Sequence, residues 1–236
     1  MSSAVPLHPE QPLSPALSSL RLIAALVFGV WFALVVFLGA REVFVAPRGT
    51  PPLSLLTAFT LPVVVFLFAY WRSSEFREFV LNADLRFLSG MQAWRFAGFT
   101  FLALFTYAIL PGYFAWPAGL GDMAIGLSAP WILVALNRNR NFASSKTFLA
   151  WNVFGLLDLV IAVTIGAIGP RLLASNQVGA VNTSVMAHLP LVLVPAYLVP
   201  MFIVFHLTAL FQARRFAGKP SARGYGSISL DEKEKL

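Results

Sequence analysis

Stretches of about 20 mostly apolar residues follow one another along this chain, and short polar segments join them. A helix needs about 20 such residues to cross the hydrocarbon core of a bilayer, which is about 30 Å thick. A membrane β-barrel would instead contain alternating strands of about 10 residues, a pattern that the sequence lacks. Hydrophobic residues make up 58% of the chain and charged residues only 11%. The sequence therefore predicts an all-α polytopic membrane protein.

The apolar stretches predict a bundle of six transmembrane helices in one domain, which covers residues 20–213. The predicted spans are 20–39, 53–71, 94–112, 117–136, 147–168 and 188–212. Between the second and third spans, residues 73–91 alternate charged with apolar residues at helical spacing. This pattern predicts an interfacial amphipathic helix. The ends of the chain, 1–19 and 214–236, are expected to be flexible cytoplasmic tails, the first rich in proline and the second basic.

Positive charges are unevenly divided between the two ends of the predicted helices. Fourteen of the 17 Lys and Arg residues, Arg95 among them, fall on the side of the chain termini, while Arg41, Arg48 and Arg171 fall on the other. Cytoplasmic loops carry the excess of Lys and Arg, so both termini are predicted to be cytoplasmic. This topology accounts for the net charge of +7. We therefore expect the chain to have the lipid bilayer as its partner and to bind no nucleic acid.

Two carboxylates, Asp122 and Asp158, lie within predicted spans. An ionisable side chain inside a membrane costs about 2.5–3.5 kcal/mol even on the lenient insertion scale. At helical spacing Asp122 shares a face with Gly119 and Gly126, and Asp158 shares one with Gly155. Small residues allow helices to approach closely, so we expect both acids to face the bundle interior and to share a polar site.

Further polar residues extend this predicted interior toward both membrane surfaces. Tyr107 and His188 are expected in the half of the membrane away from the cytoplasm. Arg95, Asn152 and His206 are expected in the cytoplasmic half. Asp, Tyr, Asn and His side chains in series are what a proton relay or a polar permeation route requires. The alternative is that Arg95 anchors the interface and that His206 snorkels or caps a helix end.

Prolines recur every five residues in the last predicted span, at Pro190, Pro195 and Pro200. The two inner prolines each remove a backbone donor and leave an earlier carbonyl without its helical partner. Such a helix is expected to bend, and Pro195 and Pro200 are therefore candidates for a hinge. Kinking for packing alone is the alternative.

Several chemistries are excluded by what the sequence lacks. The chain contains no cysteine, so disulfides and thiolate chemistry are absent. It contains no phosphate-binding loop, no H-E-x-x-H zinc motif and no G-x-S-x-G nucleophile elbow. Facing histidines for a haem are disfavoured because His188 and His206 fall on one predicted helix. We therefore expect neither a bound metal nor a cofactor.

A short motif links the chain to other membrane proteins. The stretch Trp116-Pro-Ala-Gly-Leu-Gly-Asp122 follows Arg95-x-x-Gly98 and Leu110-Pro111. It resembles uncharacterised bacterial multi-pass membrane proteins that carry a Pro-Ala-Gly-x-Gly-Asp signature. The resemblance extends through Asn152-x-x-Gly155-x-x-Asp158 to His206 and implies a location in the bacterial inner membrane. It brings no activity with it.

Three functions fit these features. The leading interpretation is a small transporter or permease that couples a solute to ions or protons through Asp122 and Asp158, as a single chain or a homo-oligomer. The second is a membrane-embedded enzyme that uses the same carboxylates with His188 or His206 as acid and base. The third is a non-catalytic subunit, in which the dipole of the helix N-terminus stabilises Asp122 and a protonated Asp158 only specifies packing.

Overall fold

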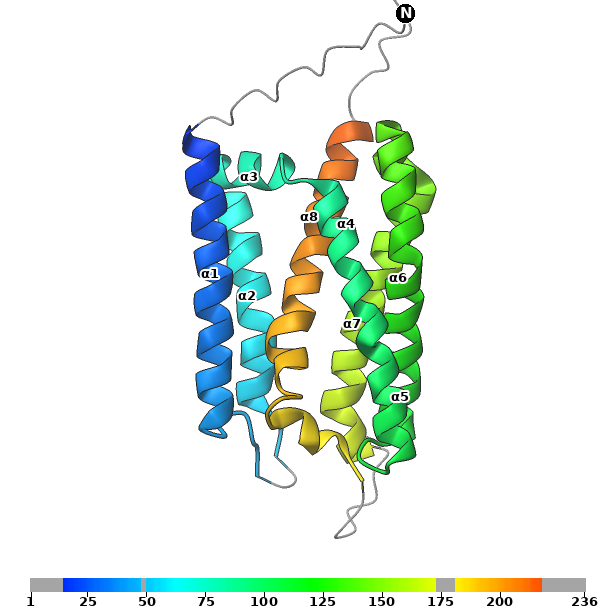
Figure 1. The fold of residues 1–236 in the computed structure, drawn as a ribbon. Coiled ribbons are helices and arrows are strands. Elements are labelled where there is room, and N and C mark those ends of the chain that lie inside the picture. The colour runs from blue at the N-terminus through cyan, green and yellow to red at the C-terminus, as the bar shows by residue number, and fades with distance from the viewer. Residues whose placement is uncertain (1–14, 48–49, 173–180, 218–236) are drawn as a thin grey trace, which may run out of the picture.

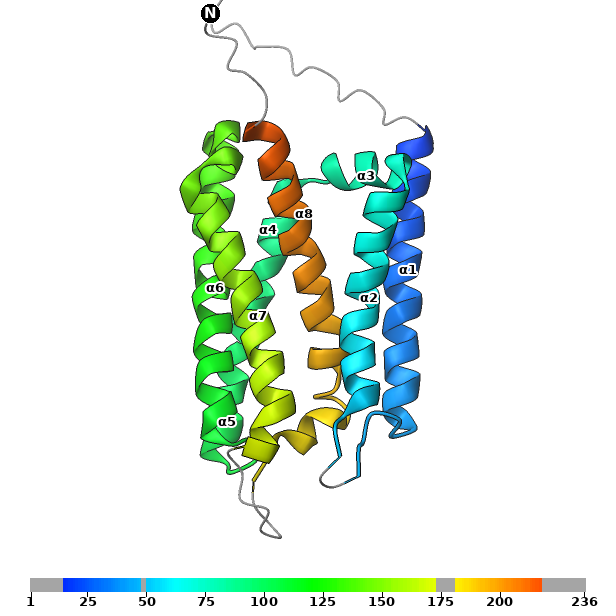
Figure 2. The same ribbon diagram turned by 180° about the vertical axis from the view of Figure 1, so that it is seen from behind.

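The computed structural model describes residues 15–47, 50–172 and 181–217, and these residues form helices and connecting turns without a β-strand. The long helices run roughly parallel in one bundle, and α3 lies across one end of it (Figures 1 and 2). The first and last described helices begin and end, respectively, at this same end. We call it the chain-end side and the other end the opposite side. The predicted all-α class is confirmed.

Five helices are long and apolar enough to cross a membrane. They account for five of the six predicted spans, with ends that differ by several residues. The predicted tails lie mostly outside the described residues, although α1 begins inside the first and α8 ends inside the second. The five are α1 (Pro15–Ala40), α2 (Leu53–Arg72), α6 (Gly112–Arg138), α7 (Lys146–Leu172) and α8 (Val199–Ala217).

The third predicted span differs from the other five because it is not one α-helix. Three short elements follow one another in a single rod beside α6: α4 (Leu85–Met91), the 3₁₀-helix η1 (Gln92–Gly98) and α5 (Phe99–Thr106) (Figure 1). The rod therefore covers residues 85–106, whereas the sequence predicted a span at 94–112. Because its middle is a 3₁₀-helix, it has no α-helical segment long enough to be counted with the five.

The predicted interfacial helix at 73–91 is divided in two. Its first part is α3 (Ser74–Leu81), which crosses the chain-end side, and its second part is α4, which belongs to the rod beside α6. Two side-chain caps account for the division. Oγ of Ser73 accepts a hydrogen bond from the amide of Phe76, and Oδ1 of Asp84 accepts one from the amide of Arg86. Asp84 thus starts a new helix inside the segment that was predicted to be continuous.

The last span contains the recurring prolines. After the 3₁₀-helix η3 (Thr183–Ala187), the chain forms a π-helical turn, η4 (Val194–Leu198), which leads directly into α8. Pro195 lies in the π turn, and Pro200 is buried one residue after the start of α8. In membrane helices, a local π adjustment can provide new partners for the backbone groups that a proline frees. The hinge at these prolines remains a prediction.

Helix α8 is the most buried of the five long helices and lies at the centre of the bundle. It packs against α2, α4 and α7, and His206 on α8 contacts Arg95 of η1. Helices α1 and α2 bury little of their surface, and their exposed residues are mostly large and apolar. This exposure is what a lipid-facing helix requires. Apart from Ser89 on α4 and Thr183 on η3, the buried polar side chains of the described residues lie on η1, α7 and α8.

Candidate functional site

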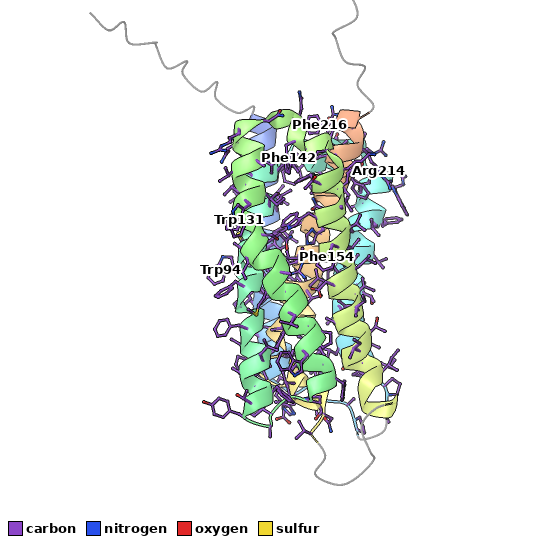
Figure 3. The ribbon with its side chains drawn as sticks, turned by 90° about the vertical axis from the view of Figure 1, so that its right-hand side faces the viewer. Trp94, Trp131, Phe142, Phe154, Arg214 and Phe216 are labelled. Atoms are coloured by element: carbon purple, nitrogen blue, oxygen red, sulfur yellow. The ribbon has the colours of Figure 1, made fainter. Side chains whose placement is uncertain are left out.

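Arg95 lies on η1 and is buried, with 2% of its surface exposed. In a 3₁₀-helix residues three apart stand above one another. Gln92, Arg95 and Gly98 consequently occupy one face of η1, and all three are buried. Figure 3 places Trp94 and Phe154, the sequence neighbours of Arg95 and Gly155, near the middle of the bundle's length. The local helix type thus turns a guanidinium toward the centre of the protein.

The guanidinium of Arg95 bridges two carboxylates from different helices. Its Nε donates to Oδ1 of Asp122 on α6 at 2.7 Å, and its Nη2 donates to Oδ2 of Asp158 on α7. We call Arg95, Asp122 and Asp158 the ion cluster. Arginine stays protonated in proteins, so with both carboxylates ionised the cluster carries one negative charge in excess. The predicted sharing of one polar site by the two acids agrees with this geometry.

A second set of hydrogen bonds holds the other side of the guanidinium. Nη1 of Arg95 donates to the carbonyl of Gly155 at 3.2 Å and lies 3.1 Å from Nε2 of His206. Because a guanidinium only donates, Nε2 must accept, and the imidazole proton is on Nδ1. Nδ1 then donates to Oδ1 of Asn152 at 3.0 Å, and the Asn152 amide donates to the carbonyl of Phe148 at 2.9 Å. His206 is therefore neutral, with both ring nitrogens engaged.

Glycines allow the helices to approach closely at every contact of the cluster. A Cβ on Gly121 of α6 would collide with the carboxylate of Asp158, and a Cβ on Gly155 of α7 would come within 2.5 Å of Cε1 of His206. A Cβ on Gly126 would lie 2.8 Å from the carbonyl carbon of Arg95. The site thus depends on positions without side chains. The same holds at the contact between Gly98 and Asp122.

Each carboxylate of the ion cluster keeps one oxygen free. Among the described residues, Oδ2 of Asp122 and Oδ1 of Asp158 accept no hydrogen bond. The side chains of Asp122 and Asp158 are 16% and 10% exposed, compared with 1% for Arg95. The carboxylates are therefore the accessible members of the cluster, and Arg95 is the sealed one.

Two buried oxygens near the cluster lack partners. Oγ of Ser89 on α4 and Oε1 of Gln92 on η1 are inaccessible and have no hydrogen-bond partner in the part of the chain that the structure describes. The amide nitrogen of Gln92 makes one long contact, 3.5 Å to the carbonyl of Phe202. A buried polar group left unpaired costs about 1–3 kcal/mol. Ser89 and Gln92 precede Arg95 by six and three residues, so they lie toward the chain-end side.

An apolar cluster closes the opposite side of the bundle. The rings of Phe101 on α5 and Phe114 on α6 meet edge to face, with centroids 5.6 Å apart. Leu110, Ala118 and Met186 are buried with them. We call this group the apolar seal. The ion cluster thus lies between buried polar residues on the chain-end side and the apolar seal on the other.

The structure brings together five of the seven side chains predicted for the pathway: Arg95, Asp122, Asn152, Asp158 and His206. Arg95 was predicted as an alternative interfacial anchor and was counted with the cytoplasmic charges. Its burial corrects both assignments, and in the sequence thirteen of the other Lys and Arg residues stay on the side predicted to be cytoplasmic, against three on the other. His206 is likewise buried and does not snorkel.

Tyr107 and His188 do not belong to the site. Tyr107 ends α5 and is 77% exposed. His188 is also exposed, and its Nδ1 lies 4.0 Å from a carboxylate oxygen of Glu42. Both predictions rested on depth along a helix, which does not determine the direction of a side chain. His188 is therefore not placed to act with the two aspartates.

Ser89 and Gln92 were missed in the sequence. The repeat Ser89-x-x-Gln92-x-x-Arg95-x-x-Gly98 was the available signal, because a spacing of three aligns residues on a 3₁₀ face and nearly aligns them on an α-helix. No group of three or more His, Asp or Glu side chains in the described ranges is arranged to hold a metal ion.

Residues 52–214 match a family described as a domain of unknown function (DUF8737). The matched region contains every element that contributes to the ion cluster and leaves α1 outside. No curated protein and no solved structure matches the chain.

Proposed function

The chain belongs to the DUF8737 family, and we propose that it is a proton-coupled membrane carrier for a small solute, with the ion cluster as its proton-binding site. The observation that supports this proposal is the charge of the cluster, in which one buried guanidinium faces two carboxylates. An uncompensated charge inside a membrane is costly. One proton neutralises the excess without any further ligand.

A proton fits the free oxygens better than a metal cation does. Hard cations such as Ca²⁺ and Mg²⁺ take six or more oxygen ligands. The ion cluster offers two, Oδ2 of Asp122 and Oδ1 of Asp158, because the neighbouring carbonyl of Gly155 and the amide oxygen of Asn152 already accept hydrogen bonds. A proton needs only one of the free oxygens. It belongs to the pair of carboxylates and not to either one alone.

The charged and titratable groups around the carboxylates have distinct parts in this proposal. Arg95 on η1 holds Asp122 and Asp158 next to each other, and neutral His206 on α8 fixes the guanidinium with Asn152 behind it. His206 has no free nitrogen with which to exchange a proton. The proton step is therefore assigned to the carboxylates, and His206 is a positioning residue.

The arrangement of polar and apolar residues favours a carrier over an enzyme. The carboxylates are approached by polar residues from the chain-end side and are closed off by the apolar seal. Access from one side at a time is what alternating access requires. An enzyme with a histidine as acid or base would need a free imidazole near the carboxylates, and His188 lies elsewhere.

We extend the proposal to the topology. Counting the rod of residues 85–106 as a sixth crossing beside the five long helices agrees with both described ends lying on one side. In the sequence, thirteen Lys and Arg residues fall on the predicted side of the termini and three on the other, and this excess favours a cytoplasmic location for both termini in a bacterial inner membrane. Single cysteines test the orientation: an impermeant maleimide added to intact cells is expected to label Thr50→Cys and not Glu75→Cys.

A pH jump on a solid-supported membrane tests the proton site without knowledge of the solute. A proton that enters a site within the membrane produces a transient current, and we expect this current from the wild-type protein. Asp158→Asn and Asp122→Asn each leave Arg95 with one carboxylate, and we expect both variants to lose the current. Glu42→Gln, which removes an exposed carboxylate outside the site, is the matched control and should keep it. If both aspartate variants gave a current as large as that of the wild-type protein, the proposal would be contradicted.

A further inference from the structure

A line of buried polar side chains leads from the chain-end side to the ion cluster. Ser89, Gln92 and Arg95 follow at intervals of three residues along α4 and η1, and each is at most 2% exposed. On the facing helix α8, Gln212 is buried at the end of this line nearest the chain-end side. Its side-chain amide donates to the carbonyls of Val80 and Ala83. Polar groups thus continue from the end of the bundle to the guanidinium.

The hydrogen-bonding capacity in the middle of this line is largely unused. Within the described ranges, Oγ of Ser89 and Oε1 of Gln92 have no partner, and the Gln92 amide nitrogen makes one contact, at the limit of a hydrogen bond. A buried amide and a buried hydroxyl together offer several donors and acceptors. Native proteins satisfy such groups with ordered water, which typically makes about three hydrogen bonds.

The spacing of the two residues suits a bridging water. Residues three apart on a helical rod have Cβ atoms about 5–6 Å apart, a separation that one water molecule spans with two hydrogen bonds. Gly90 lies between them in the chain, and the nearest described atom to a Cβ there would be Cδ2 of Leu133, at 4.0 Å. The rod therefore has no bulky side chain at this position.

We propose that water occupies the interior face of α4 and η1 at Ser89 and Gln92 and forms an inlet that connects the ion cluster to the chain-end side. The inlet rests on the proposed function, because it is the route by which a proton reaches the carboxylates. The inlet reaches the cluster from the side of Ser89 and Gln92, while the apolar seal lies on the other side.

Silver ions test the inlet because they react with thiols, are small enough to follow water, and meet no native cysteine in this chain. Ser89→Cys and Gln92→Cys are reconstituted separately in lipid nanodiscs and exposed to silver. Each is then unfolded and labelled with a fluorescent maleimide. Silver should lower the labelling of both variants at least tenfold. Glu75→Cys, on an exposed position of α3, sets the level of complete reaction.

Ala129→Cys is the matched control, since Ala129 is fully buried on α6. It should keep its maleimide labelling after silver. If silver leaves the maleimide labelling of Ser89→Cys as high as that of Ala129→Cys, the inlet is overturned. If Ser89→Cys does not fold, the same comparison is made with Gln92→Cys. Silver access without a wild-type pH-jump current would leave the inlet standing and refute the proton site, so the two failures are distinguishable.

Discussion

The carboxylate of Asp158 lies against the backbone of Gly121, at the place that a side chain on residue 121 would occupy. This contact joins α7 to α6 beside the guanidinium of Arg95. It explains why an apolar helix carries a glycine one residue before an aspartate. The glycine on one helix makes room for the acid of the other.

Gly121→Ala is expected to destabilise the protein by about 1–3 kcal/mol, the usual cost of overpacking. Gly29→Ala on α1 is the matched control, because a Cβ there meets no atom within 4 Å. Alanine is favoured over glycine within a helix by up to about 1 kcal/mol, so Gly29→Ala should be neutral or stabilising. Thermal unfolding in detergent measures both, and equal unfolding temperatures would refute the packing assigned to Gly121.

Arg95→Gln is expected to be among the most damaging single substitutions in the protein. It leaves two buried carboxylates without their cation, and breaking a buried ion pair typically costs about 3–5 kcal/mol. Arg95→Lys should also destabilise, because an ammonium cannot replace the planar fork that bonds both acids and Gly155. The variants are compared by thermal unfolding and by yield of monodisperse protein.

The triple substitution Arg95→Gln, Asp122→Asn, Asp158→Asn separates charge from shape in this experiment. It removes all three charges and keeps similar side-chain volumes. We expect it to recover a substantial part of the stability that Arg95→Gln loses. A triple variant as unstable as the single one would show that hydrogen-bond geometry, and not charge, makes Arg95 necessary.

The proton of His206 is expected on Nδ1, since Nε2 accepts from Arg95 and Nδ1 donates to Asn152. Nitrogen NMR of protein labelled at histidine distinguishes the two neutral tautomers from the charged ring. The chain has three histidines, so comparison with His206→Gln assigns the signal. A charged imidazolium or an Nε2–H tautomer at neutral pH would contradict the network.

Tyr107→Phe and His188→Gln are expected to leave stability and proton binding unchanged. Both side chains are exposed and lie away from the ion cluster. Surface substitutions of this kind usually change stability by no more than about 0.5 kcal/mol. The pH-jump current and the unfolding temperature check both variants. Loss of the current in either would show that the proton route includes that side chain and extends beyond the ion cluster and the line of Ser89 and Gln92.

The sequence revealed Asp122 and Asp158 because a carboxylate inside an apolar span is costly and therefore conspicuous. It also indicated that both face inward, since glycines share their helical faces. The partner of the two acids could not be recognised in the same way. Arg95 lies near the start of the predicted span at 94–112, where an interfacial anchor is the ordinary interpretation of an arginine.

Arg95 was misplaced because the helical rod starts at Leu85, after the Asp84 cap, and not near residue 94. Ten residues of rod precede Arg95, and this length carries it to the middle of the bundle. The positions of Tyr107 and His188 were beyond sequence reasoning for another reason. Depth follows from helix length, but the direction of a side chain at a helix end follows from the turn that comes next.

The central claim is that Arg95, Asp122 and Asp158 together bind one exchangeable proton. Infrared difference spectroscopy of the protein in lipid, recorded while the pH is lowered, detects the carbonyl stretch of a newly protonated carboxyl group. We predict such a band for the wild type and for Glu42→Gln, and its loss in Asp122→Asn and in Asp158→Asn. A wild type without the band, or a band that persists unchanged in both aspartate variants, would contradict the account.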